Sequence, residues 1–195
     1  MTLHSPASRQ ATPTAAPSPD TAPPAPPAGF QRLAMPRGFI GTNGPLYMRQ
    51  DAAGGVELGM LVEARHGNPM GVCHGGMLLT FADILLAVTV RHAEPQLGMM
   101  PTVSMSTDFL SGAPVGSFLI GSGRLLKRTR RLAFADGRVT AGDRPVLRLS
   151  GILKIPSQPL VPADRLPAGV RPAAAGHPND DGPLPGSLEQ GRPEP

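Results

Sequence analysis

The 195-residue sequence contains few of the residues that characterise several large protein classes. It has one cysteine, one tyrosine and no tryptophan, and aromatic residues make up only 4% of the chain. A single cysteine, Cys73, excludes an internal disulfide and fits a reducing compartment. The first residues also lack the apolar core of a secretory signal peptide. We therefore expect a cytoplasmic protein. The scarcity of aromatic residues and the absence of a recognition-helix pattern argue against nucleic acid as a partner.

Proline is abundant but unevenly distributed. Residues 1–28 contain 8 prolines and residues 156–195 contain 10, whereas the 127 residues between them contain only 7. The two proline-rich segments carry too little apolar surface to offset the entropy lost on ordering. We predict disordered tails at 1–28 and 156–195 and one folded domain at 29–155.

The longest apolar run of the sequence contains one carboxylate. Between residues 75 and 90 the side chains that are not plainly apolar are Gly76, Thr80, Asp83 and Thr89. A helix that is apolar on nearly every face is buried, and a central Asp disfavours a membrane span by about 3 kcal/mol. A buried carboxylate is costly unless it is partnered, protonated or useful. Asp83 is therefore either a functional group or a structural one bonded to the backbone or to Thr80.

Several other segments favour β-strands. The helix is expected at 74–91, after a short helix or irregular lead-in at 30–36, and glycine and proline mark the turns. The expected strands are 45–50 and 56–64 before the helix, then 102–110, 117–129, 132–141 and 146–155 after it. This order predicts an α+β fold in which a curled antiparallel sheet wraps one long central helix.

The residues around this helix resemble a known family. Asn68, the run 71–76 (GVCHGG) and Phe81-Ala82-Asp83 are similar to the signature of hotdog-fold acyl-CoA thioesterases, in the PaaI-type branch of the 4-hydroxybenzoyl-CoA thioesterase superfamily. The resemblance covers nearly all of 40–155 and neither tail. It departs at Phe81, where Leu is usual, and at Gly112, where Arg or Pro is frequent. It implies a hotdog fold, acyl-CoA as substrate, no metal or other cofactor, and a homodimer or a dimer of dimers.

Thioester hydrolysis needs hydrogen-bond donors for the oxyanion and a group that attacks or activates water. Gly75 and Gly76 suit the first task, because the first N–H groups of a helix are unpaired and glycine lets the substrate approach. The alternative is that the two glycines only allow tight packing. The resemblance assigns the oxyanion to the Gly75 N–H and makes Asp83 the nucleophile or the general base. Burial makes a carboxylate more basic, which suits that task.

The spacing of these two residues has a further consequence. Gly75 and Asp83 are eight residues apart on one helix, or about 12 Å along its axis. The thioester carbon must lie within about 3–3.5 Å of the attacking atom, with the oxyanion donors beside it. One helix cannot present both groups to one substrate. We therefore predict an obligate dimer with two shared sites and an inactive monomer.

The remaining candidates have supporting roles. Asn68 holds the carbonyl or the lytic water, or only stabilises a turn; Thr102 positions water, with Ser104 as its neighbour on the same face. A basic run follows residue 123 and is either a solvated turn or a site for the phosphates of coenzyme A. The predicted substrate-binding residues are His74, which braces the loop, Gly76, Ser104, Lys127, Arg128, Arg130 and Arg131.

Two other functions compete on the same fold. The first is an acyl-CoA-binding protein without catalysis, against which the intact Asn68, Gly75 and Asp83 argue. The second is a hydratase, which would carry a histidine five residues after its aspartate, where this chain has Val88. A metal site at Cys73 and His74 with the nearby His66 matches no known zinc spacing. Acyl specificity depends on pocket residues such as Met77, and only the resemblance favours aromatic acyl groups.

Overall fold

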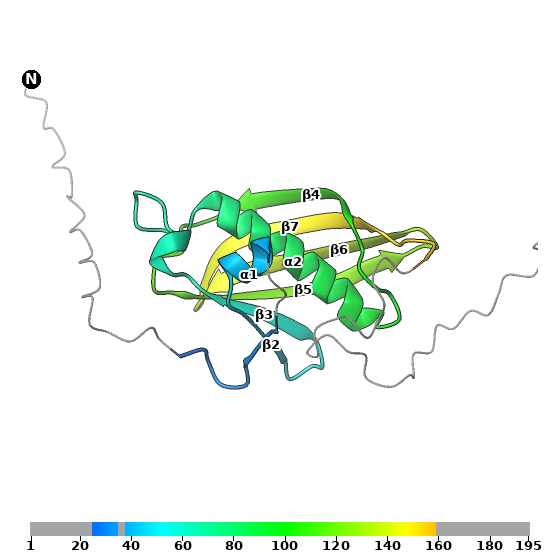
Figure 1. Ribbon diagram of the computed structural model, residues 1–195, viewed down its shortest axis with the longest axis horizontal. Helices are drawn as coiled ribbons and strands as arrows, with labels where there is room; N and C mark the ends of the chain where they lie inside the picture. Colours follow the sequence, from blue (N-terminus) through cyan, green and yellow to red (C-terminus); the bar gives the residue numbers. More distant parts are fainter. Residues whose placement is uncertain (1–24, 35–37, 159–195) are drawn as a thin grey trace, which may run out of the picture.

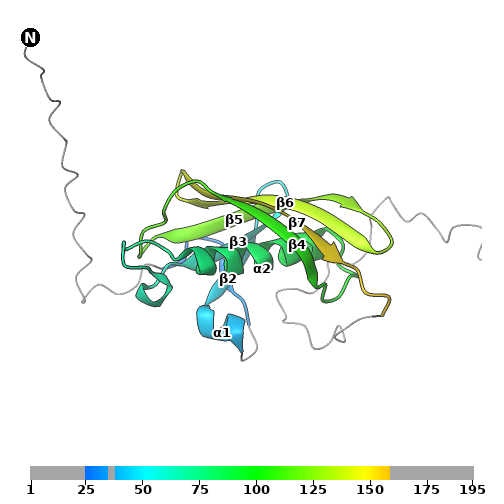
Figure 2. The same cartoon turned by 90° about the horizontal axis from the view of Figure 1, so that it is seen from above.

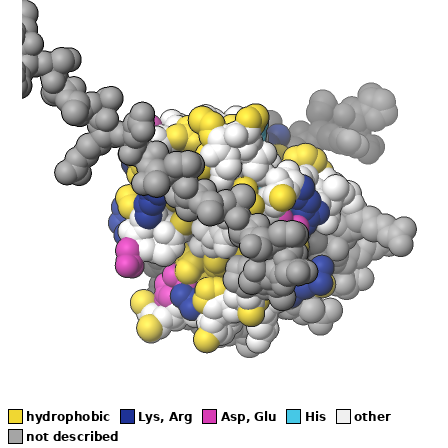
Figure 3. All heavy atoms as spheres, turned by 90° about the vertical axis from the view of Figure 1, so that its left-hand side faces the viewer, with side chains coloured by type: hydrophobic (Ala, Val, Ile, Leu, Met, Phe, Trp, Pro, Cys, Tyr) yellow, Lys and Arg dark blue, Asp and Glu magenta, His cyan; other side chains and the backbone are white. Residues whose placement is uncertain are grey.

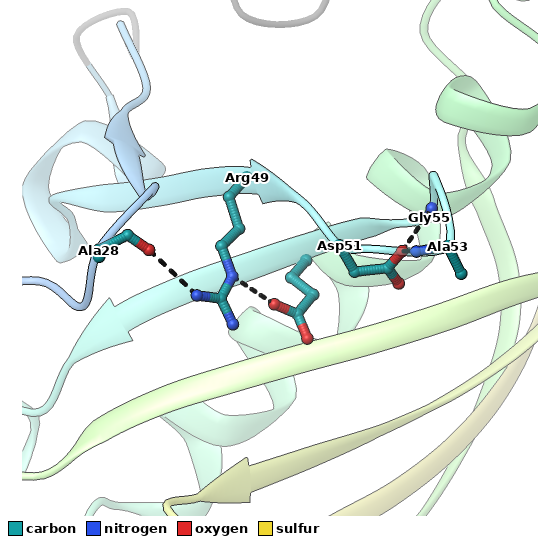
Figure 4. A network of polar contacts seen from close by, with 6 residues as sticks. Ala28, Arg49, Asp51, Ala53 and Gly55 are labelled. Carbon is teal, nitrogen blue, oxygen red and sulfur yellow. Dashed lines mark hydrogen bonds and ion pairs between the residues drawn. The ribbon is translucent and has the colours of Figure 1, made fainter.

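The computed structural model describes residues 25–34 and 38–158. Most of the two predicted tails, residues 1–24 and 159–195, lies outside the described residues. Residues 25–28, the last four of the predicted N-terminal tail, are among the described residues. The carbonyl oxygen of Ala28 accepts a hydrogen bond from Arg49 at 3.1 Å, so the described end of the first tail contacts the domain (Figure 4).

A single antiparallel sheet forms the body of the molecule (Figure 1). Its spatial order is β1-β2-β3-β5-β6-β7-β4, so β4 lies at one edge beside β7. Figure 2 shows the two helices on the same face of the sheet, with α2 against it and α1 farther out. The elements are β1 (Gln31–Arg32), α1 (Phe39–Asn43), β2 (Leu46–Gln50), β3 (Val56–Leu61), a 3-10 turn (Ala64–His66), α2 (Gly75–Ala93), β4 (Thr102–Phe109), β5 (Phe118–Arg128), β6 (Leu132–Ala141) and β7 (Arg144–Lys154).

The central helix packs closely because the sheet beneath it is rich in glycine. Phe81, Leu85 and Leu86 of α2 are fully buried. A Cβ added to Gly121 would lie 2.8 Å from atoms of Phe81 and Leu85, and one added to Gly151 would lie 2.4 Å from Leu86. Any larger residue at these sheet positions would displace the α2 side chains that pack there. The predicted α+β fold, with one long central helix against a multi-stranded antiparallel sheet, is confirmed.

The helix α2 is long and apolar enough to cross a membrane. Its mean hydropathy is 1.4, but 56% of the window is buried inside the molecule. This packing is that of a core helix, which passes the same length and hydropathy test.

The structure corrects two expectations for the first half of the chain. Within the segment 30–36, expected to be a short helix or an irregular lead-in, Gln31–Arg32 form β1, and Phe39–Asn43 form α1, a helix that was not predicted. Contacts distant in sequence hold α1 in place: the Arg65 guanidinium donates to the carbonyl oxygens of Thr42, at 2.6 Å, and of Gly44. The strand expected at 56–64 is also shorter, because Ala64–His66 turn into the loop before α2.

An aromatic cluster fixes the N-terminal segment to β2, β3 and β5. The ring of Phe30 meets that of Phe118 edge-on at 5.2 Å, and a Cβ on Gly59 would lie 2.8 Å from Phe30. Arg49 stacks over the Phe30 ring at 4.5 Å and forms an ion pair with Glu57 at 2.6 Å. These contacts hold the start of the described domain on the sheet.

Candidate functional site

The loop before α2 is shaped by backbone hydrogen bonds and by Asn68. The Oδ1 atom of Asn68 accepts from the N–H groups of Met70 at 3.0 Å and Val72 at 3.4 Å. The Asn68 side chain therefore closes a turn, as loop asparagines often do. Its amide nitrogen makes no hydrogen bond within the part of the chain that the structure describes. Turn formation uses the acceptor of this side chain and leaves the donor unused.

The first turn of α2 leaves one backbone donor unused. His74 is the N-cap, and its Nδ1 accepts from the Gly76 N–H at 3.0 Å. The N–H groups of Met77 and Leu78 donate to the His74 carbonyl oxygen at 2.9 and 3.1 Å. Only the Gly75 N–H of this turn has no acceptor among the described residues. Of the two glycines, Gly75 therefore has the N–H available for an oxyanion.

Asp83 lies in the middle of α2, hydrogen-bonded to β4. The Thr102 hydroxyl donates to Oδ1 of Asp83 at 2.6 Å. The expectation that Asp83 is buried is wrong for the single chain, in which this residue is exposed. The physical reason is that only one side of α2 contacts the sheet, and Gly76, Leu79 and Asp83 lie on the open side. Thr102, from the start of β4, is the partner of the carboxylate.

A β-bulge separates Thr102 from Ser104. Thr102 pairs with Leu153 and Ser104 with Ile152, so two residues of β4 oppose one of β7. Met105 packs against the core, so Ser104 points to the opposite face, whereas Thr102 reaches α2. The expectation that Ser104 and Thr102 share a face is therefore wrong.

Two buried side chains near the loop have shifted pKa values. His66 is 2% exposed; its Nδ1 accepts the Glu63 N–H at 3.1 Å, and its carbonyl oxygen accepts the His74 N–H at 2.7 Å. Burial, assisted by the charge of Arg65, lowers the pKa of His66, which favours the neutral ring. Burial also raises the pKa of the Cys73 thiol to about 11. Cys73 is therefore a protonated thiol at neutral pH and unsuited to act as a nucleophile.

The basic run is concentrated at the turn between β5 and β6, at the opposite end of the sheet from the loop (Figure 1). Arg124 is engaged by Asp136 through two hydrogen bonds of 2.9 and 3.1 Å. Arg128 lies 3.7 Å from Glu94, just beyond α2. Strand register links Arg128 to Thr102 across β6 and β7, a separation of three strand spacings or about 14 Å. The predicted residues Lys127, Arg128, Arg130 and Arg131 all lie at this end.

The structure thus brings the predicted site residues together in three groups. One contains Asp83 and Thr102; the second contains Asn68, His74, Gly75 and Gly76; the third is the basic turn. Asp83 and Gly75 are about 12 Å apart along α2, as their spacing requires. Ser104 joins none of these groups. Figure 3 shows the loop end of the molecule, where hydrophobic side chains lie between basic and acidic ones.

One neighbour of this site was not predicted. The ring of Phe109, the last residue of β4, lies 3.5 Å from the position that a Cβ on Gly75 would occupy. The end of β4 and the start of α2 are more than thirty residues apart. No local pattern in the sequence indicates that they meet.

Comparison with known proteins identifies the family. The sequence model of the thioesterase superfamily matches residues 70–147 of this chain. PA0474 of Pseudomonas aeruginosa is 34% identical over 130 residues, which are 67% of this chain and 97% of that protein. Its name assigns it to the esterases on the basis of inference. This chain belongs to the thioesterase superfamily. The resemblance inferred from Asn68, the glycine pair and Asp83 is confirmed.

Two further proteins are similar to this chain, one in sequence and one in fold. Human acyl-coenzyme A thioesterase 13 is 28% identical over 111 residues, which are 57% of this chain and 79% of that enzyme. A variant of the phenylacetic acid degradation protein PaaI from Thermus thermophilus has the same fold, with a TM-score of 0.51 and 22% identity. That match covers 59% of this chain and 96% of PaaI.

Proposed function

We propose that this chain hydrolyses the thioester of acyl-coenzyme A to a free acid and coenzyme A. The observation that carries the proposal is the 2.6 Å hydrogen bond from Thr102 to Asp83 on the open side of α2. It holds a carboxylate in a fixed orientation where a substrate can reach it. The similarity to human acyl-coenzyme A thioesterase 13 supports this substrate class.

The site is completed by a second copy of the chain. In the part of the chain that the structure describes, β4 has a neighbour on one side only and is eight residues long, so its other edge offers unpaired backbone groups. Val103 and Phe109 on this strand are 59% and 53% exposed. Two copies joined antiparallel along β4 bring their α2 helices side by side in opposite directions. Asp83 of one copy then faces the partner's Gly75.

In this arrangement each group has one task. Water attacks the thioester carbon and its proton goes to Asp83, or Asp83 attacks first and water then releases the acyl group. The carbonyl oxygen becomes an oxyanion that accepts from the unused Gly75 N–H and the Asn68 amide. Collapse of the tetrahedral intermediate breaks the C–S bond. The leaving thiolate takes the proton that Asp83 accepted from water or, where Asp83 attacked first, a proton from solvent.

The basic turn supports coenzyme A as the leaving group. The pantetheine arm separates the thioester from the phosphates, so the phosphates must bind away from Asp83. Arg128 lies about 14 Å from Thr102 across the sheet, on the same chain as Asp83. In our proposal Lys127, Arg128, Arg130 and Arg131 bind these phosphates through charge-assisted hydrogen bonds.

The direct test is release of free thiol from a panel of acyl-coenzyme A esters by the native protein and by Asp83→Asn. We expect the substitution to lower turnover by about 10²- to 10⁴-fold, because it removes the base or nucleophile. Asp108→Asn is the matched control. Asp108 belongs to β4 and its carboxylate is also exposed, but it is paired with Arg148 rather than with a site residue.

Two results would contradict the proposal. Unchanged turnover in a folded Asp83→Asn variant would remove Asp83 from the mechanism. No turnover of any thioester by the native protein, together with measurable binding, would favour the acyl-CoA-binding alternative.

A further inference from the structure

Phe109 occupies an unusual place for a large apolar side chain. It is the last residue of β4 and pairs with Leu147, a fully buried residue of the helix-facing side of the sheet. Phe109 itself remains 53% exposed. Its ring atoms Cε1 and Cζ lie 3.5 and 3.6 Å from the position of a Cβ on Gly75, and apart from the two chain neighbours of Gly75 no other described side chain comes within 4 Å of that position. The start of α2 therefore borders one open aromatic surface.

That surface adjoins the unused donor of the helix. The Gly75 N–H has no acceptor among the described residues, and Gly75 has no side chain of its own. A carbonyl oxygen bound at this N–H would therefore bring its substituents into the space beside the Phe109 ring.

The proposed dimer brings the partner's catalytic pair to the same place. An antiparallel pair of β4 strands in full overlap places Thr102 of one copy opposite Phe109 of the other, because these are the two end residues of the strand. Thr102 is bonded to Asp83. The Phe109 ring then lies between the Gly75 N–H of its own chain and the partner's Asp83.

The geometry points to Phe109 as the residue that selects the acyl group next to the thioester carbonyl. This inference rests on the proposed function. A flat aromatic ring gains more from a flat acyl group than from a linear chain, since aromatic pairs contribute beyond the area that they bury. Removing the ring while keeping its apolar volume should therefore affect planar acyl groups more than linear ones.

The test compares kcat/KM for benzoyl- and phenylacetyl-coenzyme A with that for butyryl- and hexanoyl-coenzyme A. In Phe109→Leu we expect the aryl-to-alkyl ratio to fall by about 2- to 12-fold. The matched control is Leu110→Ala: Leu110 is the adjacent residue, 54% exposed, and does not lie within 4 Å of the Gly75 position. This variant should keep the native ratio. Sedimentation of each variant shows whether its oligomeric state matches that of the native protein.

Equal losses for aryl and alkyl substrates, or no loss for either, would overturn the role of Phe109. Dissociation of Phe109→Leu into monomers with proportional losses would assign the ring to the subunit contact and would overturn it as well. Calorimetry measures binding of the same esters to Asp83→Asn with and without Phe109→Leu. It gives the aryl-to-alkyl ratio of affinities without turnover. The selectivity role can therefore be judged even if the native protein hydrolyses none of them.

Discussion

At the scale of single residues, some polar atoms of the loop before α2 make hydrogen bonds that shape it and others make none within the described part of the chain. The Oδ1 of Asn68 closes the turn and the ring of His74 accepts the Gly76 N–H, whereas the Asn68 amide nitrogen and the Gly75 N–H have no partner among the described residues. Folding and the proposed substrate binding therefore use different atoms of the same short segment. A substitution in this loop can impair one task while preserving the other.

The buried His66 predicts how stability depends on pH. Burial lowers its pKa below the ordinary value of 6.5, so the unfolded chain takes up the proton first as pH falls. The stability contributed by neutral His66 is complete above pH 6.5 and is lost as pH falls toward the folded pKa. Urea unfolding at pH 8 and pH 5 should show a larger loss for the native protein than for His66→Asn, which does not titrate.

The matched control replaces a histidine that is not buried in the core. His92→Gln is suitable, because His92 is only partly buried and bonds the carbonyl oxygen of Gly54 at 2.7 Å. This variant should retain the native pH dependence. An equally steep acid loss in His66→Asn would show that other groups cause it.

At the scale of elements, the contact between α2 and the sheet depends on glycines. Gly151→Ala would place a methyl group 2.4 Å from Leu86 and 3.0 Å from the Ser104 carbonyl oxygen. We expect a loss of about 1–3 kcal/mol in the free energy of unfolding, as for other overpacked cores. Chemical denaturation measures it. Ser150→Ala, one residue earlier and on the other face of β7, should change the free energy by less than about 0.5 kcal/mol.

The sequence predicted the elements whose pattern is local. The strands after α2 alternate between sheet faces, and the apolar run ended by Pro95 identified the helix. The errors involve non-local interactions. Arg65 holds α1 from more than twenty residues away, and the bulge at Thr102 reverses the side on which Ser104 lies. An apolar helix position also has the same sequence pattern whether the sheet covers it or it stays open, as Leu79 does.

At the scale of the whole molecule, the proposed shared site predicts complementation between two chains with impaired activity. Asp83→Asn lacks the carboxylate, and Asn68→Ala weakens the opposite half-site. A heterodimer of the two contains one intact site and one with both defects. After random exchange of equal amounts, activity should approach about one quarter of that of the native protein.

This experiment distinguishes a shared site from a self-contained one. Activity is measured before and after unfolding and refolding the two variants together, and separate refolding of each provides the baseline. If co-refolding gives no gain over the sum of the separate samples, each chain contains its own complete site. A gain near one quarter requires groups from two chains at each site.

The unequal edges of the sheet limit how far such association can extend. At one edge β1 is only two residues long and consists of Gln31 and Arg32, both exposed. At the other, β4 offers eight residues. A sheet that accepts a neighbour only along β4 can join one other copy. The free edges of the resulting dimer are then its two short, polar β1 strands. Strand-by-strand growth into fibrils therefore stops after one step, and the open edge that completes the proposed catalytic site is consumed in forming it.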